Sequence, residues 1–265
     1  MRGHHIFVRA SDYAFFQPRF LALAHRGGFT DPEQARQENT LVAFTRAAEM
    51  GYRYMETDVH LTCDHALVAF HDGSLDRLIG IPGTVDQVSL ADLRAAGGDV
   101  VVPTMDELLE ALPDARWNID MKSDDTVEPL ARAICRHHAE SRVCVASFSA
   151  RRLALFRHML GRRIATSASI AGTAWNLLPV LPKLIRTDSV ALQIPLVYPV
   201  AGRQVRVLTE PLVRAAHARG MKVQAWTIDD AATMERLIDQ NVDGIVTNRI
   251  DVLKQVLVRR GLWQC

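Results

Sequence analysis

The feature that most constrains the fold is a regular alternation of short apolar runs with segments of helical pattern along the 265 residues. Eight runs have the length and apolar content of buried strands. They are Phe20–Ala24, the run that starts at Tyr54, Trp117–Met121, Val143–Phe148, Ile164–Ala168, Val190–Ile194, Val223–Trp226 and Gly244–Val246. Helical patterns follow most of them, at Leu41–Met50, Val127–His138, Arg151–Met159, Pro211–Ala218, Ala231–Asp239 and Asp251–Arg259. Eight such units predict an α/β fold, a single (β/α)₈ TIM barrel over residues 1–265, with a doubly wound open sheet as the alternative.

The segment between the second and third predicted strands, residues 73–113, is longer than an ordinary connection in such a fold. Glycines and prolines punctuate it, and Leu90–Ala96 and Met105–Leu112 have the pattern of short helices. We therefore predict an insertion after the second strand. Long excursions on such folds often cover the active site, so the insertion is either a lid or a plain surface segment.

Composition excludes several classes of protein. Hydrophobic residues make up 48% of the chain, enough for a sizeable core, and the net charge of +1 gives no case for nucleic acid or an anionic membrane as a partner. The cysteines, at positions 63, 135, 144 and 265, lack C-x-x-C spacing, as expected in a reducing cytoplasm. No apolar run has the length of a membrane span, and the N-terminus lacks the apolar core of a secretion signal. We expect a cytoplasmic protein without an integral membrane segment, in an oligomeric state that stays open.

Two carboxylates, Glu56 and Asp58, are two residues apart on the second predicted strand and therefore share one face. Acids so close repel each other unless a positive group lies between them, and Mg²⁺ or Ca²⁺ commonly fills that place because both take oxygen ligands. A lone pair of this kind is more often the polar face of a half-buried strand. The same spacing recurs, however, at the end of the third strand, with Asp120 and Lys122.

The C-terminal ends of the strands form one rim of a TIM barrel, and active sites lie there. His25 and Arg26 end the first strand, before two glycines that permit a tight turn and close approach to a ligand. A guanidinium group suits phosphate, and His71 beside Asp72 is a candidate general acid or base. Convergence of these groups with the acids predicts a site that takes a cation, an anionic substrate, or both.

At these positions the sequence resembles the glycerophosphodiester phosphodiesterase family. The resemblance rests on H-R-G at 25–27, E-N-T-x-x-A-F at 38–44, E-x-D-V-x-x-T-x-D at 56–64 and H-D at 71–72. Weaker matches are N-I-D-M-K at 118–122, A-S-F-S at 146–149, A-W-T-I-D at 225–229 and D-G-I-V-T-N at 243–248. Two positions depart from the family pattern: Asp120 stands where Glu is more usual, and His65 where Gly is usual.

The resemblance implies a metal-dependent barrel enzyme that hydrolyses glycerophosphodiesters to an alcohol and glycerol 3-phosphate. It implies His25 and His71 as general acid and base, in an order that the sequence leaves open. It implies Glu56, Asp58 and Asp120 as ligands of Mg²⁺ or Ca²⁺. Arg26 and Lys122 are implied near the phosphate.

Trp226, at the end of the seventh predicted strand, is either a wall of the pocket or a barrel-core aromatic residue.

Two other functions remain in competition. One is a lysophospholipase D-like hydrolysis of lipid-tailed diesters, which an apolar funnel from Leu75, Leu78, Ile79 and the stretch that begins at Trp175 would favour. The other is a non-catalytic phosphoester-binding barrel, against which the presence of both histidines and all three acids counts. A phosphatidylinositol-type phospholipase C is also a two-histidine barrel, but three acids favour a metal. Each reading expects a small-molecule phosphodiester as the ligand.

Overall fold

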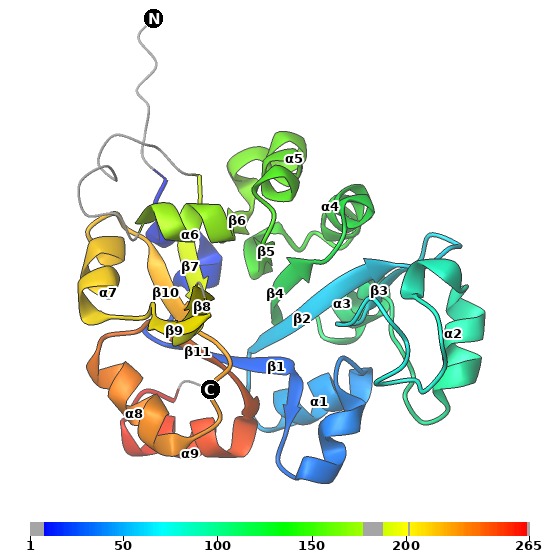
Figure 1. Ribbon diagram of the computed structural model, residues 1–265, viewed down its shortest axis with the longest axis horizontal. Coiled ribbons are helices and arrows are strands. Elements are labelled where there is room, and N and C mark those ends of the chain that lie inside the picture. The colour runs from blue at the N-terminus through cyan, green and yellow to red at the C-terminus, as the bar shows by residue number, and fades with distance from the viewer. Residues whose placement is uncertain (1–7, 177–187, 201, 264–265) are drawn as a thin grey trace, which may run out of the picture.

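Eight short parallel strands form the centre of the molecule in a computed structural model that describes residues 8–176, 188–200 and 202–263 (Figure 1). They are β1 (Leu21–Phe29), β2 (Tyr54–Leu61), β4 (Arg116–Met121), β5 (Val143–Ala146), β6 (Ala165–Thr166), β7 (Ala191–Ile194), β10 (Lys222–Ala225) and β11 (Gly244–Arg249). Their order around the sheet is β6-β5-β4-β2-β1-β11-β10-β7. A parallel bridge between Ser167 and Ala191 joins the two outer strands. The sheet is thus a nearly closed barrel, and the predicted TIM barrel is confirmed.

Helices lie between the strands and cover the barrel from outside (Figure 1). They are α1 (Leu41–Glu49), α3 (Met105–Ala111), α4 (Val127–Arg136), α5 (Ala150–Leu160), α6 (Ile170–Asn176), α7 (Glu210–His217), α8 (Ala231–Asp239) and α9 (Ile250–Arg259). Side-chain oxygens of Thr40, Thr104, Ser149, Thr209 and Asp230 cap five of them at the N-terminus. Each such cap contributes about 1 kcal/mol, which explains why these helices begin where the sequence predicts.

The strand register places the predicted polar residues side by side. In adjacent parallel strands, His25 of β1 lies opposite Glu56 of β2, and Glu56 lies opposite Asn118 of β4. One step further along, Asp58 lies opposite Asp120. Residues two apart on a strand point to the same side, so these polar side chains of β1, β2 and β4 form one compact group at one end of the barrel.

The opposite end of the barrel is closed by the N-terminal segment. Two 3₁₀ turns, Ala10–Asp12 and Ala14–Phe16, bury Phe15 and Phe16 against the barrel interior. The hydroxyl of Tyr54 donates a hydrogen bond to the carbonyl oxygen of Phe15, at 2.6 Å. Burial of two phenylalanines stabilises this closure by roughly 3–6 kcal/mol.

The predicted insertion has its own small core. Strand β3 (Leu67–Ala69), which comes just before the predicted insertion, pairs antiparallel with β2, and helix α2 (Leu90–Gly97) lies within the insertion. Buried side chains that include Leu75, Leu78 and Leu93 form a cluster separate from the main core. That the segment closes over the site stays a prediction.

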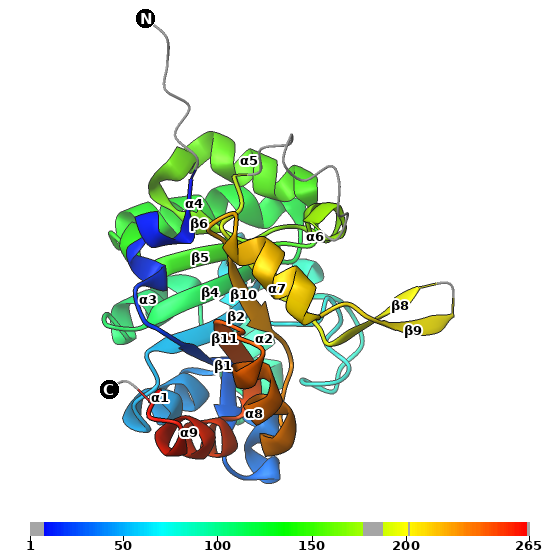
Figure 2. The same cartoon turned by 90° about the vertical axis from the view of Figure 1, so that its left-hand side faces the viewer.

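A hairpin that the sequence analysis did not predict follows β7. Its strands are β8 (Val197–Val200) and β9 (Arg203–Arg206), and Figure 2 shows it standing out from the barrel, on the side away from the N-terminal turns. The apolar stretch that begins at Trp175 is helical through Asn176 as part of α6, and residues 177–187 lie outside the described part of the chain. No helix in the described ranges is long and apolar enough to cross a membrane.

Candidate active site

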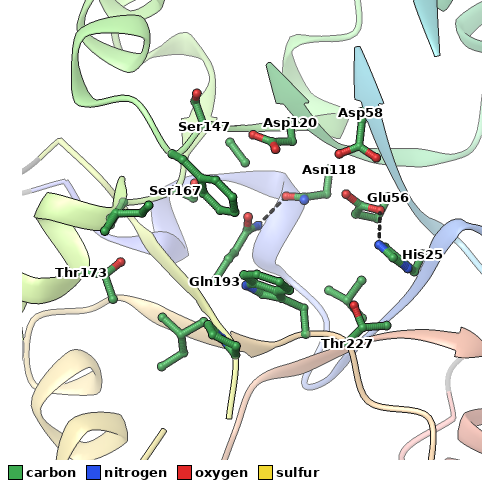
Figure 3. A pocket seen from close by; sticks show the side chains of 18 of the residues that line it. His25, Glu56, Asp58, Asn118, Asp120, Ser147, Ser167, Thr173, Gln193 and Thr227 are labelled. Atoms are coloured by element: carbon green, nitrogen blue, oxygen red, sulfur yellow. Dashed lines mark hydrogen bonds and ion pairs between the residues drawn. The ribbon is translucent and has the colours of Figure 1, made fainter. Parts of the chain in front are cut away.

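A cavity of about 500 Å³ opens at the C-terminal ends of the strands. All eight side chains that the sequence analysis selected line it: His25, Arg26, Glu56, Asp58, His71, Asp120, Lys122 and Trp226. Figure 3 shows Glu56, Asp58 and Asp120 on one wall, with His25 beside Glu56. The indole of Trp226 lines the cavity, stacks on the ring of Phe148 with centroids 6.0 Å apart and also packs against the barrel core. That it contacts substrate stays a prediction.

A distortion of β1 aims His25 and Arg26 into the cavity. The pairing of β1 with β11 shifts register between Ala24 and Phe29, and three consecutive residues from Arg26 have positive φ, at 53°, 87° and 64°. A Cβ on the first glycine, Gly27, would lie 2.6 Å from the Cβ of Ala43. Glycine is therefore required at this position by both conformation and space.

The three residues of the E-N-T motif, at positions 38–40, each stabilise the turn after His25. Glu38 accepts a hydrogen bond from the Arg26 guanidinium at 3.2 Å. Asn39, at φ 59°, donates its backbone N–H to the Arg26 carbonyl oxygen and accepts from the Thr57 hydroxyl at 2.8 Å. Thr40 then caps α1. These three residues thus fix Arg26 and link it to both β2 and the first helix.

Opposite charges alternate on the carboxylate wall. The Lys122 Nζ lies 2.7 Å from Asp58 Oδ1 and 2.8 Å from Asp120 Oδ2. The Arg26 Nε lies 3.4 Å from Asp58 Oδ2. Burial works to raise the pKa of Asp58, but these two cations outweigh it and hold that pKa below its usual range.

For Glu56, the same two cations are too weak to offset burial and the neighbouring acids. Burial, and then the neighbouring Asp58 charge, raise the pKa of Glu56 well above its ordinary value. Burial also raises the pKa of Asp120. The wall therefore carries more buried acid than its two cations neutralise, and an additional positive charge would stabilise it.

The unsatisfied oxygens on this wall show where a cation fits. Within the described part of the chain, Glu56 Oε2, Asp58 Oδ2 and Asp120 Oδ1 are buried without a hydrogen-bond partner. No three His, Cys, Asp or Glu side chains among the described residues already form an ion cage, and Lys122 instead bridges two of these acids. Three buried carboxylates, each with an oxygen that accepts no hydrogen bond, nonetheless suit Mg²⁺ or Ca²⁺, so these side chains are the ones that would hold it.

His25 is held in one tautomer. Its Nδ1 lies 2.6 Å from Asn248 Oδ1, and the Asn248 Nδ2 donates to Asp229 Oδ2 at 2.8 Å. A carboxylate only accepts, so the amide must turn its NH₂ group to Asp229 and its oxygen to His25. The His25 Nδ1 is therefore the protonated nitrogen, and Nε2, 3.7 Å from Glu56 Oε2, carries a lone pair. Burial, and then Arg26, lower the pKa of His25 to about 4.

His71 has a charged partner instead of an amide. Its Nδ1 lies 2.6 Å from Asp72 Oδ1, and Arg77, from the insertion, pairs with both Asp72 and Glu38. Since Glu38 also holds Arg26, one ionic chain connects the surroundings of His71 with the turn after His25. The described insertion residues thus support the site from outside without lining the cavity.

The far side of the cavity is apolar. Its lining there comes from Ile170, Ile194, Pro195, Tyr198 and Val207. The apolar lining also includes Phe148, whose ring centroid lies 5.8 Å from Lys122 Nζ beside the carboxylates. Leu75, Leu78 and Ile79 do not form the funnel that would favour a lipid-tailed substrate, because Leu75 and Leu78 are buried in the separate core of the insertion and none of the three lines the cavity. The three side chains pack the insertion, whereas the apolar wall comes from α6, β7, β8 and the loops that adjoin them.

A group of amide side chains at the floor of the cavity was not predicted from the sequence. Gln193 Nε2 donates to Asn118 Oδ1 and, at 2.7 Å, to Gln224 Oε1 (Figure 3 shows the first contact). Asn118 and Gln193 line the cavity. Asn118 falls within the quoted N-I-D-M-K match, whereas Gln193 carried no signal beyond its place in a predicted strand.

The rim of the barrel carries two histidines, one paired with an amide and one with a carboxylate, beside three buried acids. This arrangement indicates a class of protein, the TIM-barrel hydrolases of phosphoric esters. The model of the glycerophosphoryl diester phosphodiesterase family matches residues 25–252. The chain is 40% identical over 247 residues to a probable glycerophosphodiester phosphodiesterase of Mycobacterium tuberculosis, with 92% of each chain covered. The chain belongs to this family, and it is a phosphoric diester hydrolase.

Solved structures agree with the fold. A putative glycerophosphoryl diester phosphodiesterase of Silicibacter pomeroyi superposes with a TM-score of 0.76 at 21% identity, covering 96% of this chain and 98% of that one. A phosphodiesterase of Oleispira antarctica, solved with its product sn-glycerol-3-phosphate, gives a TM-score of 0.72 at 24% identity, with 90% and 96% covered. A lysophospholipase D of Rattus norvegicus is 31% identical over 126 residues, which is 41% of this chain and 39% of that one.

Proposed function

We propose that this hydrolase cleaves glycerophosphodiesters to an alcohol and glycerol 3-phosphate, with a divalent cation, His25 as general base and His71 as general acid. The hydrogen bond from His25 to an amide that Asp229 orients is the observation that carries the assignment. The names of the Mycobacterium relative and of the Oleispira product complex support the substrate class. Free thiols at the three described cysteines fit a cytoplasmic location.

The tautomer of His25 suits it to accept a proton. With Nδ1–H donated to Asn248, the lone pair of Nε2 faces the cavity. It takes the proton from the attacking oxygen, which is water or a neighbouring glycerol hydroxyl. If the hydroxyl attacks, the alcohol leaves a cyclic glycerol phosphate, and water then opens this ring to give glycerol 3-phosphate. A neutral amide partner orients the ring without the added stabilisation that a carboxylate would give to the imidazolium.

His71 has the partner that a proton donor requires. Asp72 accepts its Nδ1–H, and the carboxylate stabilises the imidazolium form. The opposite nitrogen then gives its proton to the leaving alkoxide. Arg77 holds Asp72 in place, so the acid is oriented from the insertion.

The cationic side chains act on the phosphate. Arg26 and Lys122 line the cavity beside the acids and attract the single negative charge of a phosphodiester. When bound, Mg²⁺ or Ca²⁺ supplies Lewis-acid stabilisation of charge that develops on the phosphoryl oxygens. Glu56, Asp58 and Asp120 would hold it, and their unpartnered oxygens support this.

A leaving-group experiment separates the two histidines. His25→Ala and His71→Ala are compared on glycerophosphocholine and on a glycerol p-nitrophenyl phosphodiester, whose leaving group needs no proton. We expect both variants to lose about 10²–10⁴-fold on glycerophosphocholine. On the aryl ester, His71→Ala regains most of its activity and His25→Ala does not. The reverse pattern exchanges the roles, and near-normal turnover of both variants contradicts the assignments.

A second candidate substrate is a lipid-tailed diester, as in a lysophospholipase D. The apolar wall opposite the carboxylates favours it, because a glycerol headgroup alone leaves that wall exposed to water. Comparison of kcat/KM for glycerophosphocholine and lysophosphatidylcholine tests this. Preference for the soluble diester contradicts the lipid-tailed reading and leaves the reaction unchanged.

A further inference from the structure

The β8–β9 hairpin stands out from the barrel (Figure 2), and its Tyr198 lines the mouth of the cavity. All four residues of β9 are exposed, and so are Val197, Tyr198 and Pro199 of β8. A two-stranded hairpin by itself is marginally stable in water, and exposed apolar residues do not improve its solubility. The described residues therefore leave this ribbon with an apolar surface that its own fold does not use.

Exposed apolar side chains gather around this mouth. Eleven large ones are exposed in the described part of the chain, and five belong to the hairpin or the adjoining cavity rim: Phe148, Ile170, Val197, Tyr198 and Val205. Phe148, Ile170 and Tyr198 also line the cavity. The exposed apolar rim is thus continuous with the apolar wall inside.

The hairpin is also locally basic although the whole chain is nearly neutral. From Pro195 to Thr209 the sequence contains Arg203 and Arg206 and no acidic residue. Arg206 lies opposite Val197 in the ladder, and Tyr198 lies opposite Val205. Alternating basic and apolar groups of this kind complement an anionic lipid surface, where side chains enter the interface and arginines meet headgroup phosphates. The net charge of +1 for the whole chain therefore does not indicate the local positive charge of the hairpin.

We propose that the hairpin and the apolar rim dock the enzyme on an anionic lipid surface. The rim surrounds an opening, so a protein that covered it would seal the cavity, whereas a lipid surface would present its own molecules to the site. An acyl chain leaving the cavity along the apolar wall would stay in contact with Ile170 and Tyr198 until it reached the bilayer. Surface binding does not depend on the proposed reaction, so its failure and the failure of that function are distinguishable.

The test measures sedimentation of the full chain with vesicles of phosphatidylcholine alone or with phosphatidylglycerol added. We expect binding to the anionic vesicles only, weakened by added salt. Arg203→Gln with Arg206→Gln should weaken it by about 30-fold, since each arginine contributes about 5-fold near such a surface. Val197→Ser with Val205→Ser should weaken it by about 10-fold.

Leu155→Ser with Val258→Ser is the matched control, because both side chains are comparably exposed apolar residues away from the mouth. This control should bind like the unchanged protein. None of the substituted side chains lines the cavity, and thermal unfolding followed by circular dichroism reports that each variant is folded, whatever its activity. Equal sedimentation of all variants overturns the proposal, as does absence of binding to anionic vesicles. A dimer in size-exclusion chromatography that Val197→Ser with Val205→Ser dissolves would also overturn it, in favour of a protein interface.

Discussion

Asp229→Asn is the substitution that tests the acid–base assignment most sharply. Asp229 accepts hydrogen bonds from the Thr247 hydroxyl at 2.9 Å, from the Asn248 backbone N–H at 2.8 Å and from the Asn248 side chain at 2.8 Å. The asparagine side chain of the variant has only one oxygen, and this oxygen continues to accept from the Thr247 hydroxyl and the Asn248 backbone N–H. Its NH₂ group then faces Asn248, which turns its own oxygen away from His25. The ring of His25 must next accept at Nδ1 and carry its proton on Nε2, where it cannot act as a base.

The expected loss follows from the hydrogen bonds. To recover the productive tautomer, the variant must set two NH₂ groups face to face and leave two buried donors without acceptors. Each such donor costs about 1–3 kcal/mol, so two cost about 4 kcal/mol at the middle of the range. At about 1.4 kcal/mol per factor of ten, kcat falls about 10³-fold. KM changes little because Asp229 does not line the cavity.

Steady-state release of glycerol 3-phosphate gives kcat and KM, and ¹⁵N spectra of histidine-labelled protein report which nitrogen of His25 is protonated. Asp230→Asn is the control, since Asp230 caps α8 and asparagine caps equally well. Unchanged kcat in Asp229→Asn, or a reduced kcat with His25 still protonated on Nδ1, would refute the reasoning.

Three further predictions concern the turn after β1, the β2–β3 turn and the acid wall. Gly27→Ala should lower the free energy of unfolding, measured by urea titration, by about 2–4 kcal/mol, because φ is 87° and the new Cβ would lie 2.6 Å from that of Ala43. Gly80→Ala is the control for backbone strain alone: φ is 82° and no described atom lies within 4 Å, so the loss should be about 1–2 kcal/mol. His65→Gly should raise the free energy of unfolding by about 0.5–1 kcal/mol, because His65 has φ 63°, and a decrease would contradict this account. Asp120→Asn should raise the Mg²⁺ or Ca²⁺ concentration that gives half-maximal activity by at least about 10-fold, and an unchanged titration would remove Asp120 from the proposed ligands.

The position of the site could be predicted because its signals are local. Parallel strands meet at one rim, so residues at strand ends such as His25, Glu56 and Asp120 converge once the barrel is recognised. The left-handed conformation of His65 also explains a departure seen in the sequence: glycine suits that turn, and the exposed His65 does not line the cavity.

The histidine roles could not be predicted because they depend on contacts between distant segments. Asn248 is 223 residues from His25, and nothing in either motif indicates which atom faces which. The apolar lining of the cavity could not be located from the sequence for a similar reason. Apolar residues such as Leu75 look alike in sequence whether they pack an insertion or line a cavity, and only the packing separates these cases.

The most direct test of the central claim is release of glycerol 3-phosphate from glycerophosphocholine by protein stripped with EDTA and then given Mg²⁺ or Ca²⁺. The account predicts no release in EDTA and full recovery with at least one of the two ions, because three buried carboxylates with unpartnered oxygens line the site. Release that EDTA leaves unchanged would contradict the role given to Glu56, Asp58 and Asp120. No release from this substrate or from lysophospholipids with either ion would favour a phosphoester-binding barrel over the enzyme.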